Sequence, residues 1–293
     1  MAKNWLTRRK FLTGAALTGM ACVGLADALF VEPRHLVARR VEVHLRRLPE
    51  AFEGFRIAQI SDIHYGPYMG APGVERALRL AQTFHPELLV LTGDFVSHPW
   101  RRPNGREGAH FIEPCADVLA QWKAMRMVAI LGNHDHWNHG GIVEAGLKER
   151  GIPVLRNAAF PLERGSDKLW IAGIDDALVR AADLNLTLRG IPPDETTVLL
   201  AHEPDFADHA AAYPVDLQLS GHSHGGQVRL PGVGALVLPG MARKYPIGLN
   251  RAGNLQVYTN VGLGVINPPV RFLCPPEVTF LTLFQDRTQT AIR

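Results

Sequence analysis

The sequence predicts an α/β fold with two packed, mixed β-sheets and helices on their outer sides. From residue 41 onward, apolar runs of strand length alternate with segments of helical periodicity, which is typical of a largely buried sheet covered by helices. The second half of the chain is richer in strand-like runs, so two packed sheets are the economical arrangement. Of the 293 residues, 46% are hydrophobic and 20% charged, which is enough apolar material for a core.

The strand-like runs differ in the burial we expect for them. VEVHL (41–45) alternates like a half-buried strand, whereas FRIAQI (55–60) is continuous enough for burial on both faces. Segment 73–84 repeats its apolar residues at helical spacing. The other expected strands are 87–91, 127–131, 168–174, 196–200, 216–220, 226–230, 235–238, 255–260 and 277–284, and the other expected helices are 110–124 and 139–150.

The first 40 residues form a targeting segment that we separate from the folded domain. TRRKFLTG (7–14) places two arginines before a long apolar run, which is typical of a bacterial signal read by the twin-arginine export machinery. The alternative is a simple membrane anchor with a basic flank. Ala26-Asp27-Ala28 has the form of a cleavage site, but a run of about 20 residues is also long enough to remain in the bilayer. We expect a signal or anchor and linker at 1–40, a folded domain at 41–285 and a tail at 286–293.

Charge and cysteine content argue against several classes of protein. The formal net charge is only +3, and Lys and Arg are spread along the chain, so we expect no nucleic-acid partner. Cys22, Cys115 and Cys274 lack the paired spacing of a metal site, and their odd number does not suit a disulfide framework. A single bridge between Cys115 and Cys274 stays open.

Five of the predicted strands are followed by polar residues of the kinds that bind metals, in the segments SDIH, TGD, GNHD, AHE and SGHSH. In open α/β sheets, ligands gather beyond the carboxyl ends of the strands. Taken singly, an Asp or Asn at such a place is typical of a turn or cap, and a lone His of a hydrogen-bonded ring. Recurrence at five strand ends instead predicts one shared site. Its donors are oxygens of Asp62, Asp94 and Asn133 and nitrogens of His64, His202, His222 and His224.

These seven donors predict two divalent metal ions. A tetrahedral zinc site takes four ligands, so seven donors with one bridging carboxylate suit two ions that keep positions for water and substrate. Nitrogen and oxygen donors without thiolate favour Mn, Fe, Zn or Co over Mg or Ca. Two such ions carry more positive charge than two Asp side chains neutralise, so we expect an anionic substrate such as a phosphoester.

The order of the motifs D-x-H, GD, GNHD, H and GHxH, in blocks between residues 56 and 284, resembles the calcineurin-like metallophosphoesterases. The stretches 221–232 and 259–283 are similar to membrane-associated or exported bacterial phosphodiesterases of the YkuE and YaeI type. The resemblance implies a four-layer α/β/β/α sandwich. It also implies one metal held by Asp62, His64 and His224, a second held by Asn133, His202 and His222, and Asp94 as the bridge.

The resemblance gives catalytic roles to two further residues. With Asn133 assigned to a metal, His134 is left to face the substrate, where an imidazolium would protonate the leaving oxygen or stabilise charge on phosphate. Asp135 is expected to orient that imidazole. We expect His136 and His139 to be solvated residues at the start of a helix.

The implied reaction is hydrolysis of a phosphoester, in which two ions about 3.5 to 4 Å apart lower the pKa of a bridging water for attack on phosphorus. The sequence lacks GxSxG and Walker patterns, which argues against a serine hydrolase or a P-loop enzyme. The first functional hypothesis is an exported phosphodiesterase acting on lipid headgroups or cell-wall polymers. The second is a pyrophosphate hydrolase of a nucleotide-linked lipid A precursor of the UDP-2,3-diacylglucosamine type. The third, a noncatalytic metal-binding scaffold, is disfavoured by the full ligand set.

Two loops are candidates for selecting the substrate. Segment 97–110 contains Trp100 and three arginines, and segment 239–248 contains Arg243 and Lys244. Arginine binds phosphate oxygens in a fork, and Trp100 would cover an apolar or cyclic group. An ordinary solvated surface loop is the alternative reading of the first segment.

Overall fold

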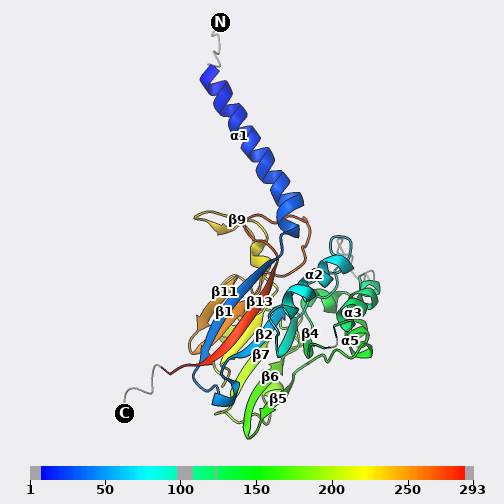
Figure 1. The fold of residues 1–293 in the computed structure, drawn as a ribbon, viewed down its shortest axis with the longest axis vertical. Coiled ribbons are helices and arrows are strands. Elements are labelled where there is room, and N and C mark those ends of the chain that lie inside the picture. Colours follow the sequence, from blue (N-terminus) through cyan, green and yellow to red (C-terminus); the bar gives the residue numbers. More distant parts are fainter. Residues whose placement is uncertain (1–7, 98–107, 123, 288–293) are drawn as a thin grey trace.

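The structure is a computed structural model, and it describes residues 8–97, 108–122 and 124–287. Two β-sheets pack face to face, and a long N-terminal helix projects from one end of the domain (Figure 1). The core between the sheets consists of side chains such as Ile57, Val90, Ile171 and Val198, all fully buried. Helices cover the outer faces, so the predicted four-layer arrangement is confirmed.

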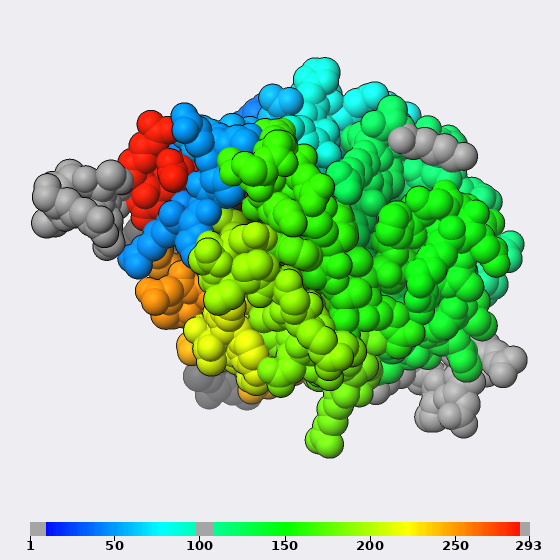
Figure 2. Space-filling view, turned by 90° about the horizontal axis from the view of Figure 1, so that it is seen from below, coloured from blue at the N-terminus to red at the C-terminus, as the bar shows by residue number. Residues whose placement is uncertain are grey.

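The first sheet has five strands in the order β1, β13, β2, β3, β4. Strand β13 inserts parallel to β1 and antiparallel to β2, so the beginning and the end of the domain share one sheet. Seen from the end opposite the N-terminal helix, the early and late segments, blue and red, lie side by side (Figure 2). The strands are β1 (Val37–Leu45), β13 (Glu277–Gln285), β2 (Phe55–Ile60), β3 (Leu88–Thr92) and β4 (Met127–Ile130).

The second sheet has six strands in the order β11, β12, β8, β7, β6, β5, of which the central four are parallel. Both edge strands were missed from the sequence. Pro161 lies within β5, and β11 is largely polar, and both features are tolerated at an edge because one side of the strand stays unpaired. The strands are β11 (Gly248–Ala252), β12 (Leu255–Thr259), β8 (Leu217–Ser220), β7 (Thr196–Leu200), β6 (Asp167–Gly173) and β5 (Ala158–Arg164).

Helices cover the two sheets unequally. The outer face of the first sheet carries α2, α3 and α5, and α2 buries the predicted apolar stripe, whereas only short helices and loops cover the second sheet. The helices are α2 (Ala71–Gln82), α3 (Ile112–Ala120), α4 (Asn133–Trp137), α5 (Gly140–Glu149), α6 (Leu184–Thr187) and α7 (Ala207–Ala210), with short turns η3 (Glu50–Phe52), η4 (Ala109–Phe111), η5 (Pro204–Phe206) and η6 (His224–Gly226). A separate hairpin pairs β9 (Arg229–Leu230) with β10 (Gly234–Ala235), shorter than the two strands predicted there.

The N-terminal helix is joined to the domain by buried contacts at its foot. Helix α1 (Arg8–Ala26) continues through η1 (Asp27–Val31) and η2 (Glu32–Arg34), and Lys10–Arg34 is apolar and long enough to cross a membrane. At the foot, the carboxylate of Glu32 accepts hydrogen bonds from the backbone N–H groups of Leu273, at 2.8 Å, and Cys274. Contacts with the domain therefore begin before residue 37, where β1 starts. The domain boundary at residue 40 stays a prediction.

Candidate metal centre

The predicted donors come together where parallel strands of both sheets end. Six of them form two buried clusters, and within each cluster the ligand atoms lie within 4.8 Å of one another. The first cluster comes after β2 and β8, and the second comes after β3, β7 and β8. The first consists of Asp62, His64 and His224, and the second of Asp94, His202 and His222.

The first cluster brings two imidazole nitrogens into close contact. The Nε2 atoms of His64 and His224 lie 2.9 Å apart, and their rings stack with centroids 4.8 Å apart. The Nε2 atom of His224 also lies 3.4 Å from Oδ1 of Asp62. Three donor atoms that face one another inside the protein are an arrangement typical of ligands of one ion.

Asp94 faces both clusters. Its Oδ2 atom lies 3.6 Å from Nε2 of His64 and 3.3 Å from Nε2 of His202, while its Oδ1 atom accepts a hydrogen bond from the backbone N–H of His134 at 2.8 Å. A carboxylate oxygen between two sets of histidines has the position that a bridging ligand requires.

Hydrogen bonds select which nitrogen each histidine of the second cluster presents. Nδ1 of His202 lies 2.7 Å from the carbonyl oxygen of Thr92, and Nε2 of His222 lies 2.9 Å from that of Gly240, which leaves the opposite ring nitrogen for a metal in each case. Among the described residues, the buried Nε2 of His202 and Oδ1 of Asn133 have no hydrogen-bond partner. Buried polar atoms are seldom left unpaired in folded proteins, so these atoms fit a bound metal.

The backbone of the site is held in an uncommon conformation. Five of the predicted ligands have φ between 48° and 64°, in the left-handed region that few residues other than glycine adopt. The turns also approach one another closely: a Cβ atom at Gly132 would lie 2.4 Å from Oδ1 of Asp94, and one at Gly221 would lie 1.8 Å from Oγ of Ser61. The five ligands are Asp62, His64, Asp94, His222 and His224.

Comparison with known proteins agrees with this geometry. Residues 55–226 match the model of the family described as calcineurin-like phosphoesterase. The chain belongs to this family. It is 33% identical to the uncharacterized metallophosphoesterase YkuE of Bacillus subtilis, over 95% of this chain and 98% of that protein. It is 29% identical to the phosphodiesterase YaeI of Escherichia coli, over 95% and 99% of the two chains. It is 26% identical to the UDP-2,3-diacylglucosamine pyrophosphatase LpxG of Chlamydia trachomatis, over 86% and 90%.

The chain is therefore a metal-dependent phosphoester hydrolase with two metal-binding clusters. The sequence motifs identified the family correctly, and the structure brings the predicted ligands together. The assignment of each ligand to one metal, and the part played by Asn133, stay predictions.

Burial lowers the pKa of three of the four histidines in this calcineurin-like site. It lowers the pKa of His64 to about 3 and that of His222 to about 4, and it holds the pKa of His224 well below its usual range. Burial alone would lower the pKa of His202 as well, but the adjacent carboxylate of Asp94 outweighs it and raises the pKa. Three imidazoles are thus neutral at neutral pH, the form that binds a metal.

Asp135 has a task that the sequence did not predict. Its Oδ2 atom accepts hydrogen bonds from the backbone N–H groups of Asp94, at 2.8 Å, and Gly132, at 3.0 Å, and its Oδ1 atom accepts one from Phe95 at 2.8 Å. The carboxylate therefore fixes the turn after β3 to the turn after β4. The expected orientation of the His134 ring by Asp135 stays a prediction. That ring lies 4.8 Å, between centroids, from the ring of His64.

Arg271 supports the first cluster and was not singled out by the sequence. Its guanidinium is fully buried and donates hydrogen bonds to the carbonyl oxygens of Cys274, Val261, Gly262 and Gly264. The same loop then reaches the site, because the N–H of Gly264 donates to the carbonyl oxygen of Asp62 at 2.7 Å. The only signal in the sequence was the position of Arg271 inside the stretch 259–283, which the resemblance marked without giving it a role.

Of the two loops predicted to select the substrate, the structure describes the second, 239–248, in full and the first, 97–110, only in part. Residues 98–107, with Trp100, Arg101 and Arg102, lie outside the described residues. In the second loop, the carbonyl oxygen of Gly240 contacts His222, and Lys244 forms an ion pair with Asp208 at 2.6 Å. This loop therefore contacts the second cluster through its backbone.

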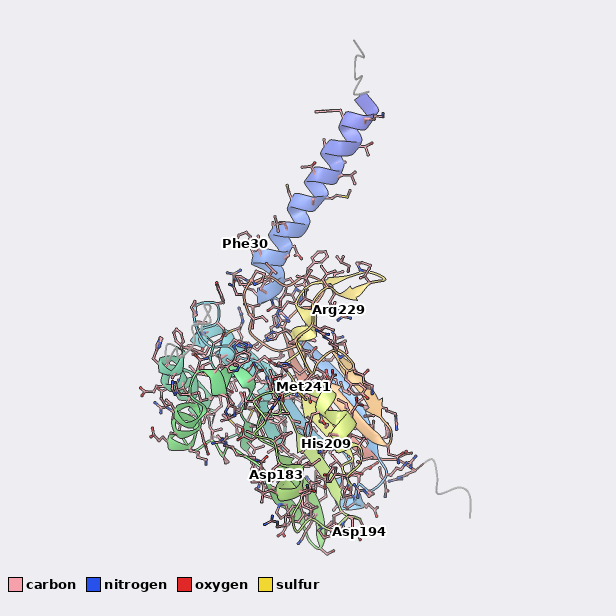
Figure 3. The ribbon with its side chains drawn as sticks, turned by 180° about the vertical axis from the view of Figure 1, so that it is seen from behind. Phe30, Asp183, Asp194, His209, Arg229 and Met241 are labelled. Carbon is pink, nitrogen blue, oxygen red and sulfur yellow. The ribbon has the colours of Figure 1, made fainter. Side chains whose placement is uncertain are left out.

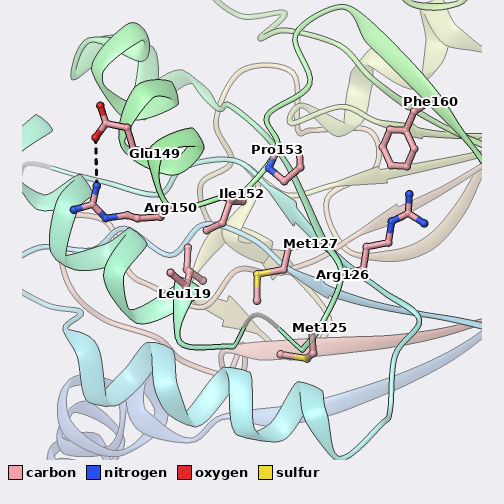
Figure 4. Close-up of a pocket in the computed structure, with 11 residues that line it drawn as sticks. Leu119, Met125, Arg126, Met127, Glu149, Arg150, Ile152, Pro153 and Phe160 are labelled. Carbon is pink, nitrogen blue, oxygen red and sulfur yellow. Dashed lines mark ion pairs between the residues drawn. The ribbon is translucent and has the colours of Figure 1, made fainter.

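A surface pocket of about 720 Å³ is lined by residues that include none of the predicted metal donors (Figure 4). It is bounded by the start of β4, by Leu119 of α3 and by Glu149–Pro153, and it contains the ion pair between Arg150 and Glu149. The described residues that line it include no histidine and no aspartate. Glu149 is the one carboxylate among these lining residues, so they form no cluster of metal donors.

The prediction that His136 is a solvated residue is wrong. Its side chain is 16% exposed, and its Nε2 atom lies 2.7 Å from Oδ1 of Asp175, whose other oxygen binds Arg156 at 2.7 Å. The partner lies 39 positions along the chain, at the end of another strand, so local sequence gave no signal for the pair. His139 is half-buried and precedes α5 with φ of 67°.

We expect the substitution His136→Gln to destabilise the fold in a pH-dependent way. Burial alone would lower the pKa of His136, but Asp175 outweighs it and raises the pKa, whereas the pKa of Asp175 is lowered. A raised histidine pKa stabilises the fold fully below about pH 6.5, and this stabilisation is lost as the pH rises through the folded-state value. The loss in free energy of unfolding should be about 1–2 kcal/mol at pH 6 and smaller at pH 9, measured by urea denaturation in detergent. The exposed His209→Gln serves as control, and an equal loss at both pH values would contradict the assignment.

Proposed function

We propose that the chain is a phosphodiesterase that acts on a phosphodiester of the bacterial envelope, with its catalytic domain on the exported side of the membrane. The observation that carries the catalytic part is the Asp94 carboxylate between two buried histidine clusters. The similarity to the phosphodiesterase YaeI over nearly all of both chains supports the preference for diesters.

The donors define which residues would hold the two ions. Asp62, His64 and His224 would bind one ion, His202, His222 and Asn133 the other, and Asp94 both. When bound, such ions supply positive charge for the phosphoryl oxygens and lower the pKa of a water molecule. Because the donors are nitrogen and oxygen, Mn, Fe, Zn and Co fit them better than Mg or Ca.

His134 is the residue in position to handle a proton. It is half-buried, follows Asn133, and its ring packs edge-on against His64 and tilted against Trp137, both at 4.8 Å between centroids. Its backbone N–H is fixed by Asp94. A ring held beside the first cluster is suited to protonate the leaving oxygen, and the hydrolysis needs no nucleophile from the protein.

The central test is metal-dependent hydrolysis of bis(p-nitrophenyl) phosphate by the full-length chain in detergent with added Mn²⁺. The wild type should release p-nitrophenol, and His222→Ala should reduce the rate at least about 100-fold because one ligand of the second ion is lost. His209→Ala, an exposed histidine outside both clusters (Figure 3), should remain active. If His222→Ala kept wild-type activity at equal metal content, the proposed centre would be refuted.

A second test addresses proton donation by His134. His134→Gln should keep both metals, as measured by elemental analysis, but should lower kcat by about 100-fold for esters with poor leaving groups. The decrease in kcat should be smaller for p-nitrophenyl esters, because their leaving group, p-nitrophenolate, departs without protonation. An equal loss for good and poor leaving groups would contradict the role.

A pyrophosphatase is the second candidate function, because LpxG shares 26% identity with the chain. LpxG is named for a nucleotide-linked lipid, UDP-2,3-diacylglucosamine, and we expect such a nucleotide to be cytosolic, so topology separates the two functions. We expect Asp194→Cys, in a Cys22→Ser background, to react with a membrane-impermeant maleimide in spheroplasts, and not to react when Arg8→Lys and Arg9→Lys block export. Reaction only after the spheroplasts are lysed, with the native signal intact, would favour the pyrophosphatase.

A further inference from the structure

The β9–β10 hairpin exposes apolar side chains to an unusual extent. Residues 229–237, which we call the docking hairpin, have the sequence RLPGVGALV. Val233 is 70% exposed and Val237 75% exposed, and Leu230 and Leu236 are exposed too. The one charged residue, Arg229, donates its guanidinium N–H to the carbonyl oxygen of Gly225 at 2.8 Å. A contiguous apolar projection of this kind marks a surface that contacts another apolar phase.

The docking hairpin lies at the foot of the N-terminal helix. Figures 1 and 3 both show it beside the end of the helix that joins the domain. The N–H of Arg229 donates to the carbonyl oxygen of Phe272 at 2.9 Å, and the N–H of Arg271 donates to that of Ala28 at 3.0 Å, so one loop joins the hairpin to the helix. Exposed apolar residues continue across this junction, at Leu273, Phe30 and Val31.

The docking hairpin also contacts the backbone that follows the first metal cluster. A Cβ atom at Gly226 would lie 2.5 Å from Cβ of Ala235 and 2.8 Å from the carbonyl oxygen of Val237, so the hairpin packs directly on this glycine. Gly226 is two residues after His224 and belongs to the same turn. On the other side, Sγ of Cys274 lies 3.3 Å from the carbonyl oxygen of His224.

We propose that the docking hairpin, with Leu273, Phe30 and Val31, inserts into the phospholipid bilayer that the N-terminal helix enters. The surface is continuous with a helix long enough to span a membrane, and its exposed side chains carry no charge that would have to leave water. Arg34, at the end of the helix, is exposed and lies where a lipid headgroup would accept its charge.

The insertion makes a second contact with the membrane and fixes the orientation of the domain. Because the helix is joined to the domain at its foot, a helix alone would let the two rotate and tilt together in the membrane, whereas helix and hairpin together hold the first metal cluster near the headgroups. Resting on the proposed function, this narrows the substrate class to phosphodiesters presented at the bilayer surface. Because enzyme and substrate would lie at the same bilayer surface, the effective concentration of the substrate at the metal site would be higher than in solution.

The test measures insertion with a fluorophore on a single cysteine of the full-length chain in phosphatidylcholine–phosphatidylglycerol vesicles. Val233→Cys in a Cys22→Ser background carries the label, since Cys115 and Cys274 are buried. Nitroxide groups on the lipid chains should quench this label at least about twofold, because apolar residues of interfacial elements reach the acyl boundary. Asp194→Cys, exposed at the end of the domain away from the helix (Figure 3), should not be quenched. Equal, weak quenching at both positions would overturn the proposal.

A charge variant tests the consequence for catalysis. Val233→Asp with Val237→Asp should abolish quenching of a label at Leu236→Cys and leave hydrolysis of soluble bis(p-nitrophenyl) phosphate unchanged. Hydrolysis of hexadecyl p-nitrophenyl phosphate carried in the vesicles should fall about tenfold, since acidic residues are unfavourable at the bilayer. An unchanged rate on the vesicle substrate would refute presentation by the hairpin. If the wild type hydrolysed neither substrate, the proposed function would be wrong. The quenching measurement would still show whether the hairpin inserts into the bilayer.

Discussion

The structure around the metal centre depends on one constraint: carboxylate and imidazole groups from the ends of four strands must lie close together in the interior of the protein. Asp94 is where this constraint is tightest, because its carboxylate serves both clusters while its own backbone N–H is held by Asp135. A buried carboxylate is tolerated only when charge or hydrogen bonds compensate for lost solvation. The glycines at 132 and 221 and the amide contacts of Asp135 are consequences of bringing these turns so close.

A second tier of buried charge connects this centre to the N-terminal helix. Arg271 donates hydrogen bonds to four carbonyl oxygens of the loop behind the first cluster, and Glu32 accepts hydrogen bonds from two backbone N–H groups of the same loop. The hydrogen bonds described for both charged groups go to backbone atoms of this loop, so the two side chains help to determine its shape. The same loop, residues 261–274, therefore contacts both the end of the N-terminal helix and the first metal cluster.

The sequence predicted the parts that follow from periodicity and chain order. Buried parallel strands have continuous apolar runs, so β2 was placed residue for residue, and parallel strands end at one edge, so the donors after them were expected to meet. The edge strands β5 and β11 were missed because unpaired edges accept proline and polar residues. The pair of His136 with Asp175 and the backbone contacts of Asp135 could not be predicted, since each depends on the spatial approach of turns that are far apart in sequence.

The left-handed backbone at five predicted ligands has a consequence for the evolution of such chains. Each of these residues carries strain of about 1 kcal/mol that a glycine at the same place would relieve. Replacing a ligand by an apolar residue would also remove a buried polar group. Without metal, many such inactive variants should therefore have a higher free energy of unfolding than the parent chain. Selection for stability alone would therefore favour replacement of these ligands, so their presence is explained by the metal binding that they provide and not by the stability of the fold.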